Sequence, residues 1–240
     1  MQAQTTRDCL VLIPGTLCDE RLFKRCASAL RRQCRLIVLD YRRLQDLQDW
    51  PRQLLQQLPA RFSLAGFSLG GLWALELLRR APERIQRLAL IASNAEAGGR
   101  RSVRRNTALR RHWQAGGPDR VLREVMPDYF HHSAQRRRHT GLVQAMARAT
   151  PSRAARTELE WAARRPAGLA ALSALQAPLL IVSGAKDRIC PRPLQQRMCA
   201  AQPSAQWVEL ARCGHFIPLE QPAALTRLLL QWLRRPSAAG

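Results

Sequence analysis

The stretch Gly66-Phe67-Ser68-Leu69-Gly70 matches the pattern G-x-S-x-G, in which a serine lies between two glycines. The pattern is typical of a sharp turn from a strand into a helix that leaves the serine hydroxyl exposed at its tip. The flanking sequence fits such a turn, because residues 61–65 predict a short buried strand and residues 71–80 predict a helix. Ser68 is therefore a candidate nucleophile, and the alternative is a plain glycine-serine turn between a strand and a helix.

A serine hydroxyl becomes an effective nucleophile at neutral pH beside a general base, and that base needs a carboxylate to orient it. Asp187 and His215 each stand just after a predicted strand, so we expect them at the same edge of a parallel sheet as Ser68. The order serine, acid, histidine along the chain is the order that accompanies this type of turn. The predicted catalytic residues are Ser68, Asp187 and His215, and Glu96, after the fourth predicted strand, is an alternative acid.

Four motifs give the chain a resemblance to the α/β-hydrolase superfamily that extends from Leu10 to about Leu233. Together they are specific for the superfamily and much less specific for any one substrate. The resemblance implies an α/β-hydrolase fold and a serine hydrolase. The motifs are Ile13-Pro14-Gly15-Thr16, Gly66-Phe67-Ser68-Leu69-Gly70-Gly71, Gly184-Ala185-Lys186-Asp187 and Gly214-His215-Phe216-Ile217-Pro218-Leu219-Glu220.

An enzyme of this kind needs two backbone N–H groups that stabilise the oxyanion of the reaction intermediate. One is expected at Leu69, the residue after the nucleophile, and the other in the loop after the first predicted strand. The resemblance assigns the second donor to Thr16, with Leu17 as the fallback. Many relatives have histidine where this chain has Pro14, but that position is not the donor. The alternative for this loop is a tight strand-to-helix turn without a donor.

Predicted strands and helices alternate along most of the chain, which indicates an α/β fold with a short, mostly parallel six-strand sheet flanked by helices. The alternation breaks between two core segments, residues 1–93 and 177–240, where residues 94–176 read as helical without strand signals. The resemblance implies that this insertion is a helical cap over the active site. Strands are predicted near residues 9–13, 35–39, 62–65, 87–92, 178–183 and 206–210, and core helices near 19–32, 49–58, 69–80, 193–201 and 221–234.

Composition narrows the class of protein further. No run of 18 apolar residues predicts a membrane span, and no apolar segment near Met1 predicts a signal peptide. The seven cysteines are scattered, without a C-x-x-C pair, which favours reduced thiols in a cytoplasmic protein. The four histidines other than His215 stand among arginines in the predicted cap, so we expect no metal site, and no cofactor is expected.

The chain is strongly basic, with a formal net charge of +22. Arginine accounts for nearly all of the basic residues, and the net positive charge per residue is less than twofold higher in the predicted cap than in the rest of the chain. One interpretation of the charge is therefore a generic solvated surface. The other is a docking surface for an acidic acyl carrier protein. No basic segment interleaved with aromatic residues predicts nucleic-acid binding. The docking residues of that second interpretation are Arg100, Arg101, Arg104, Arg105, Arg136, Arg137 and Arg138.

These observations predict a hydrolase that cleaves a carboxylic ester or thioester of a small molecule through an acyl-enzyme on Ser68. Within the superfamily, the chain resembles the pimeloyl-acyl-carrier-protein methyl ester esterases and related carboxylesterases in size, order of catalytic residues and basic cap. One alternative is a carrier-linked methyl ester as substrate, and another is C–C bond cleavage or a lyase step with the same residues. A third is a non-catalytic protein that keeps the turn for folding.

Overall fold

The fold is built on a six-stranded sheet in which every strand is parallel to its neighbours, in the order β2-β1-β3-β4-β5-β6. The computed structural model describes residues 8–40 and 49–237. The predicted six-strand parallel sheet is confirmed, although β3 and β4 extend beyond their predicted bounds. The strands are β1 (Cys9–Ile13), β2 (Arg35–Val38), β3 (Phe62–Phe67), β4 (Ile85–Ile91), β5 (Leu179–Gly184) and β6 (Gln206–Leu210).

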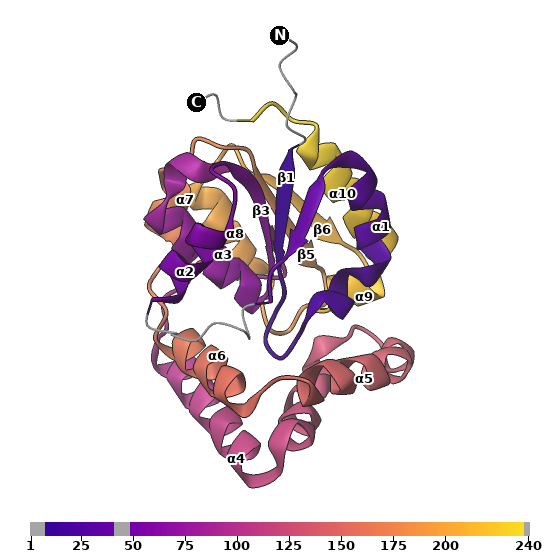
Figure 1. Cartoon of the computed structure of the whole chain (residues 1–240). Coiled ribbons are helices and arrows are strands. Elements are labelled where there is room, and N and C mark those ends of the chain that lie inside the picture. Colours follow the sequence, from indigo (N-terminus) through magenta and orange to yellow (C-terminus); the bar gives the residue numbers. More distant parts are fainter. Residues whose placement is uncertain (1–7, 41–48, 238–240) are drawn as a thin grey trace.

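Helices cover both faces of this sheet (Figure 1). Strand β1 shows why, because Leu10 and Leu12 pack into the hydrophobic core on one face while Val11 and Ile13 pack into the core on the other. One face carries α1 (Lys24–Gln33), α9 (Ile217–Glu220) and α10 (Pro222–Leu233). The other carries α2 (Trp50–Gln57), α3 (Leu69–Arg80), α7 (Leu169–Ser173) and α8 (Arg192–Ala201). Among the described residues, the 3₁₀ turns η1 (Glu20–Phe23) and η3 (Pro82–Arg84) complete the core, and η1 replaces the start of the helix predicted from residue 19.

Three further helices lie beyond the carboxyl ends of the strands and form a V below the sheet (Figure 1). These cap helices are α4 (Arg100–Tyr129), α5 (Ser133–Arg148) and α6 (Ser152–Arg164). Helix α4 bends at Gly116 and Gly117, where Gly117 has a φ of 61° that disfavours other residues, and Pro118 follows. Helix α7 falls within the range predicted for the cap, yet it packs against α3 and α8 of the core. The domain bounds at 94 and 176 stay a prediction.

Aromatic residues attach α6 to the core. The indole of Trp161 on α6 makes edge contacts with Trp50 and Trp73, at ring-centroid distances of 5.6 and 5.7 Å. Trp50 and Trp73 are themselves stacked at 4.2 Å and almost fully buried. This cluster joins α6 to the core helices α2 and α3.

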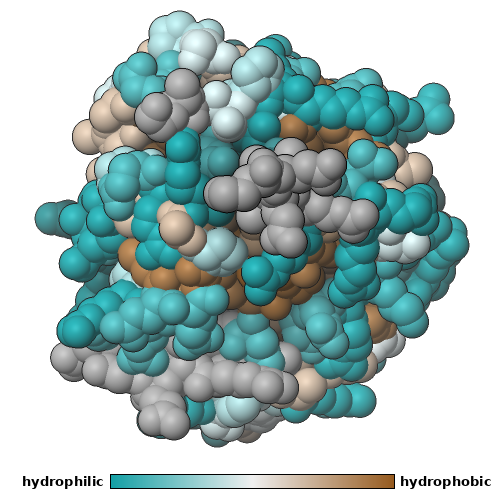
Figure 2. All heavy atoms as spheres, turned by 45° about the horizontal axis from the view of Figure 1, so that its top comes forward, coloured by the Kyte–Doolittle hydropathy of each residue, from teal (hydrophilic) through white to brown (hydrophobic). Residues whose placement is uncertain are grey.

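The face of the molecule drawn in Figure 2 is mostly hydrophilic. In this view, with the top of Figure 1 turned toward the reader, the visible hydrophobic residues lie mainly in a band between hydrophilic ones (Figure 2). Val103 is the one large hydrophobic residue that is exposed within residues 8–40 and 49–237. Across the same residues, no helix combines the length and the apolar character that crossing a membrane requires.

Candidate active site

Ser68 lies at the turn between β3 and α3, in a backbone conformation that few residues other than glycine adopt. Its φ is 53° and its ψ is −116°. The flanking glycines permit this turn, because a Cβ on Gly66 would overlap the backbone of Gly70, and a Cβ on Gly70 would overlap the carbonyl of Ile13. The Ser68 N–H donates to the carbonyl of Ile91, which fixes the turn against β4. The turn predicted from the G-x-S-x-G pattern is present as expected.

The close approach at Gly66 leads to a stability prediction. We expect Gly66→Ala to lower the free energy of unfolding by about 1–3 kcal/mol or more, because the added methyl group has to displace backbone atoms. Thermal unfolding followed by circular dichroism measures this as a lower Tm. Gly141→Ala in α5 is the matched control, since no atom outside its own stretch of helix lies within 4 Å of the place its added methyl group would take, and alanine favours a helix. Equal Tm values for both variants would contradict the prediction.

The structure brings Ser68, His215 and Asp187 together in a hydrogen-bonded chain. The Ser68 Oγ lies 2.8 Å from Nε2 of His215, and the Nδ1 of His215 lies 2.9 Å from Oδ2 of Asp187. With the imidazole neutral, the Nδ1–H donates to Asp187, which leaves Nε2 free to accept the hydroxyl proton of Ser68. His215 and Asp187 are buried, with 2% and 5% of their surface exposed. This is the geometry that an activated serine requires.

Asp187 is held as a carboxylate. Burial by itself would raise the pKa of Asp187, but the neighbouring His215 ring and two backbone N–H groups outweigh it and hold the pKa below its usual value. Those N–H groups belong to Ile189 and Cys190 and donate to Oδ1 at 2.8 and 2.9 Å. One carboxylate oxygen is thus held by the backbone, and the other is aimed at His215.

The loop that carries His215 is held by groups that the sequence analysis did not single out. The carbonyl of Tyr129, at the end of α4, accepts the backbone N–H of His215 at 2.9 Å, and the Tyr129 ring stacks on the imidazole. Glu220 accepts the N–H of Gly214 with one carboxylate oxygen and the N–H of His131 with the other, both at 2.9 Å. Burial raises the pKa of Glu220, although these two bonds act against it. Because Tyr129 ends α4 and His131 lies in the link between α4 and α5, the cap helps to position the imidazole.

Two of the predicted oxyanion donors, Thr16 and Leu69, line the same cavity as Ser68. Within the described part of the chain, the N–H groups of Thr16 and Leu69 donate to no other group, so both remain available to a ligand. The fallback donor Leu17 differs, because its N–H donates to Oε2 of Glu158 on α6 at 2.8 Å. The geometry therefore supports Thr16 rather than Leu17.

The alternative acid, Glu96, lies away from His215. Its carboxylate pairs with the Nε of Arg197 at 3.2 Å, and Asp187 is the carboxylate that contacts the imidazole.

The described residues contain one cluster of side chains of the kinds that bind metal ions, formed by Asp187, His215 and Cys190. Burial raises the pKa of Cys190 to about 12, so its sulfur stays a thiol, which is a poor metal ligand. That no metal or cofactor binds remains a prediction.

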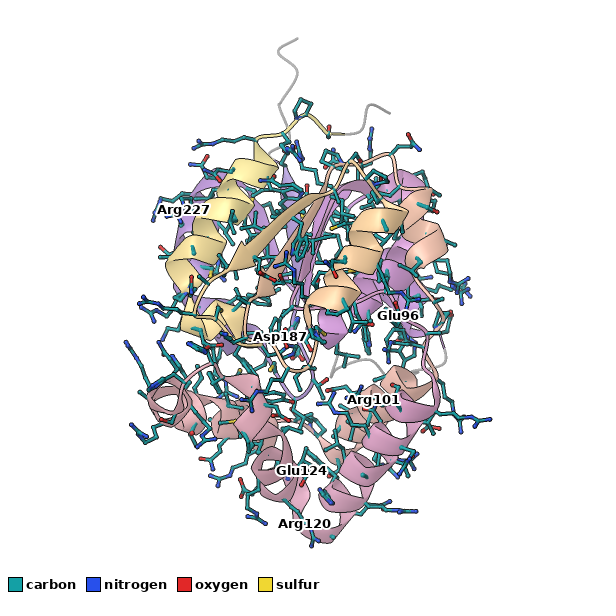
Figure 3. The ribbon with its side chains drawn as sticks, turned by 180° about the vertical axis from the view of Figure 1, so that it is seen from behind. Glu96, Arg101, Arg120, Glu124, Asp187 and Arg227 are labelled. Carbon is teal, nitrogen blue, oxygen red and sulfur yellow. The ribbon has the colours of Figure 1, made fainter. Side chains whose placement is uncertain are left out.

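A cavity of about 750 Å³ opens beside Ser68, between the core and the cap helices. Its cap wall is mixed in character, with apolar residues such as Leu109 and Val125 next to charged ones. Figure 3 shows Arg101 and Glu96 near the junction of the cap and the core, and Glu124 deeper between the arms of the V. The charged residues that line the cavity are Glu96, Arg101, Arg105, Glu124, Asp128, Arg165 and Arg188.

The fold and the serine site together define a hydrolase of the α/β type. The chain belongs to the alpha/beta hydrolase family, whose family model matches residues 10–228. Among curated proteins, it is 29% identical over 193 residues to a pimeloyl-[acyl-carrier protein] methyl ester esterase of Aromatoleum aromaticum, covering 73% of this chain and 75% of that protein. An esterase of the same name from Nitrosomonas europaea is 29% identical over 189 residues, which cover 72% of this chain and 71% of that protein.

Solved structures agree with this fold. A thermophilic esterase from Thermogutta terrifontis superposes with a TM-score of 0.83 at 22% identity, over 96% of this chain and 90% of that one. An enol-lactonase from Burkholderia xenovorans superposes with a TM-score of 0.80 at 20% identity, over 94% of this chain and 91% of that one. At such identities, the likeness establishes the fold alone.

Proposed function

We propose that this hydrolase cleaves a carboxylic ester or thioester through an acyl-enzyme on Ser68. The observation that carries the proposal is the continuous chain from Ser68 through His215 to Asp187, with distances of 2.8 and 2.9 Å. A serine in this position argues against hydrolysis by an aspartate nucleophile. The chain of hydrogen bonds also argues against a non-catalytic protein that keeps the turn only for folding, since folding does not require an aligned histidine and carboxylate.

In the acylation step, the Ser68 Oγ attacks the acyl carbon while Nε2 of His215 takes the hydroxyl proton. Asp187 stabilises the imidazolium that forms, and the N–H groups of Leu69 and Thr16 stabilise the oxyanion. The imidazolium then protonates the leaving alcohol or thiol, and the acyl group stays on Ser68. In the second half, His215 activates a water molecule, which releases the acid and restores the serine.

The acyl group and the leaving group of the substrate have to fit the cavity beside Ser68. A screen of p-nitrophenyl esters of rising chain length, run beside carrier-protein methyl esters, tests the proposal directly. We expect measurable turnover with at least one of these substrates, and an optimum chain length that reflects the cavity. Purified protein that hydrolyses none of them would contradict an ester or thioester hydrolase.

A carrier-linked methyl ester is the finer proposal for the substrate. The relatives named above act, by name, on a pimeloyl-acyl-carrier-protein methyl ester, and the basic cap supports an acidic carrier here too. Arg101 and Arg105 line the cavity beside Ser68, whereas Arg136 to Arg138 lie on α5, the other arm of the V (Figure 1). The predicted docking arginines therefore form two groups, and the group on α4 is adjacent to the catalytic serine.

Charge reversal distinguishes a docking surface from a generic basic one. We expect Arg101→Glu combined with Arg105→Glu to slow turnover of a carrier-bound ester about tenfold or more, and added salt to slow the wild type, because exposed charges are screened over about 8 Å at physiological ionic strength. Turnover of p-nitrophenyl acetate should change less than about threefold, since the catalytic residues are untouched. The same double reversal on Arg136 and Arg138 tests the second group.

Arg227→Glu is the matched control, because Arg227 lies on α10, on the core and away from the cap (Figure 3). This control should leave both reactions unchanged. Equal slowing of the carrier ester and of p-nitrophenyl acetate, or no salt dependence specific to the carrier, would contradict carrier docking. In that case, the net charge of +22 is a generic surface property and the enzyme acts on small esters.

A second candidate is C–C bond hydrolysis with the same three residues. The observation that favours it is a 34% identity over 64 residues to a 2-hydroxy-6-oxononadienedioate/2-hydroxy-6-oxononatrienedioate hydrolase of Burkholderia vietnamiensis, which covers 27% of this chain and 22% of that protein. The ultraviolet absorbance of a conjugated 2-hydroxy-6-oxo dienoate, which falls as the compound is cleaved, reports this reaction. If the protein cleaves this dienoate faster than it hydrolyses any ester, C–C bond hydrolysis replaces the ester proposal.

We further propose a cytoplasmic location. All seven cysteines lie in the described part of the chain, and none of them forms a disulfide there. Scattered free thiols are typical of a reducing compartment.

A further inference from the structure

We infer that Glu158 of α6 is a positioning residue that holds the oxyanion loop in its active shape. The inference rests on the proposed serine-hydrolase function and adds a residue that acts on catalysis from the cap. Its basis is the hydrogen bond between the Oε2 of Glu158 and the backbone N–H of Leu17, at 2.8 Å. The two residues are 141 positions apart in the sequence, and the side chain of Glu158 is fully buried.

The loop after β1 makes a tight turn with an unfavourable residue in it. The N–H of Cys18 donates to the carbonyl of Gly15 at 3.1 Å, which closes a four-residue turn. Leu17, at the third position, has a φ of 56°, while Thr16 at the second position is not in the left-handed region. This combination defines a type II turn, in which glycine or asparagine is preferred where this chain has leucine. The conformation costs about 1 kcal/mol or more for a residue with a side chain.

The carboxylate of Glu158 binds the peptide group whose orientation distinguishes this type II turn from the less strained type I turn. Types I and II differ by a rotation of the central peptide, here between Thr16 and Leu17, by about 180°. Glu158 binds the N–H of this peptide, and the Sγ of Cys18 donates to its carbonyl oxygen at 3.3 Å. In the rotated form, the Thr16 carbonyl oxygen would face the carboxylate and repel it. The bond to Glu158 therefore stabilises the strained turn and penalises the alternative.

The position of Thr16 depends on this turn. Thr16 contributes the proposed second oxyanion donor, and donors of this kind act only within about 2.7–3.1 Å of the oxyanion. The Thr16 N–H belongs to the preceding peptide, so a rotation of the peptide after Thr16 acts on it through the adjustment of the loop backbone. A displacement of about 1 Å can cost about a hundredfold in rate. Glu158 contacts neither the substrate nor the reacting atoms in this account, so its effect passes through the loop.

Glu158 can hold the loop because α6 is itself fixed. Trp161, one helical turn further along the same face, packs against the stacked pair Trp50 and Trp73 of the core. Arg165, just past the end of α6, donates from its Nε to the carbonyl of Glu96 at 2.9 Å. A cap helix that is attached to the core thus carries the carboxylate, which couples the placement of the cap to the oxyanion loop.

The test compares variants of Glu158 in the full-length protein. Glu158→Met removes the acceptor while keeping the length of the side chain, and we expect kcat for a p-nitrophenyl ester to fall about 10- to 100-fold, with KM within about threefold. Glu158→Gln keeps an acceptor oxygen and should retain most of the activity. Glu160→Gln is the matched control, because Glu160 is exposed on the same helix and pairs with Arg164, and it should behave as the wild type.

A second readout reports the oxyanion hole itself. A trifluoromethyl ketone binds when the Ser68 Oγ adds to its carbonyl carbon, the hydroxyl proton passes to His215 and the ketone oxygen becomes an oxyanion. We expect Glu158→Met to weaken this binding by the same factor as kcat/KM, which a general loss of stability in the cap would not do. Leu17→Gly in the Glu158→Met background should recover part of the lost kcat, because glycine accepts the positive φ without strain.

If Glu158→Met does not fold, Glu158→Asp takes its place, because it keeps the charge but withdraws the carboxylate from the Leu17 N–H, and a loss of about fivefold or more in kcat is expected. Full activity and full ketone affinity in a folded variant without the bond would overturn the inference alone. A wild type that reacts with neither ester nor ketone would overturn the proposed function, and the role of Glu158 with it. A Tm loss without a parallel loss of ketone affinity assigns Glu158 a structural role only.

Discussion

Replacing Ser68 with alanine is expected to lower ester hydrolysis by about 10³-fold or more while the protein stays folded. The hydroxyl is the only group placed 2.8 Å from Nε2 of His215 among the described residues, so no neighbouring side chain can take its role. Steady-state rates with the best p-nitrophenyl ester measure the effect, and circular dichroism with thermal unfolding checks the fold. Hydrolysis at wild-type rates by a folded Ser68→Ala protein would contradict the assignment.

The second large effect is expected at the acid. Asp187→Asn should lower kcat by about 10²–10⁴-fold, because a neutral amide cannot stabilise the imidazolium and can fix His215 in the wrong tautomer. The amide oxygen can still accept the N–H groups of Ile189 and Cys190, so the loop should keep its shape. The measurement is the same steady-state assay, with KM recorded separately to show that the loss falls on kcat.

Glu96→Gln is the matched control for the acid. Glu96 follows β4 and lines the same cavity, but its carboxylate pairs with Arg197 and not with His215. We expect this variant to change kcat less than about threefold. A large loss for Glu96→Gln together with a small one for Asp187→Asn would show that the acid follows the fourth strand rather than the fifth.

The parts of the fold that the sequence predicts are those fixed by local pattern. Strands such as Cys9–Ile13 are continuous apolar runs because both faces of a parallel sheet are covered, and such runs are visible without any structure. The turn around Ser68 is set by two glycines whose Cβ atoms would overlap backbone, so a five-residue pattern identifies it. The meeting of Ser68, Asp187 and His215 follows from one rule, since each residue stands after the carboxyl end of a parallel strand.

The contacts between distant segments are what the sequence could not predict. No short pattern links Glu158 to Leu17 across 141 residues, and the strain at Leu17 becomes visible only in its φ of 56°. The role of the Tyr129 carbonyl depends on where α4 ends relative to the His215 loop, and a backbone acceptor leaves no trace in the side-chain pattern. The bend of α4 had a local signal in Gly116 and Gly117, but the V shape that it produces depends on packing.

The central claim is that Ser68 is the nucleophile of a serine hydrolase. Mass spectrometry of the intact protein and of its peptides, after reaction with a fluorophosphonate, tests this most directly, because the reagent phosphonylates a serine that a neighbouring base activates. We expect one adduct per chain, located on Ser68, and no adduct in Ser68→Ala. An adduct on another residue, or an unmodified Ser68 in a preparation that hydrolyses esters, would contradict the account.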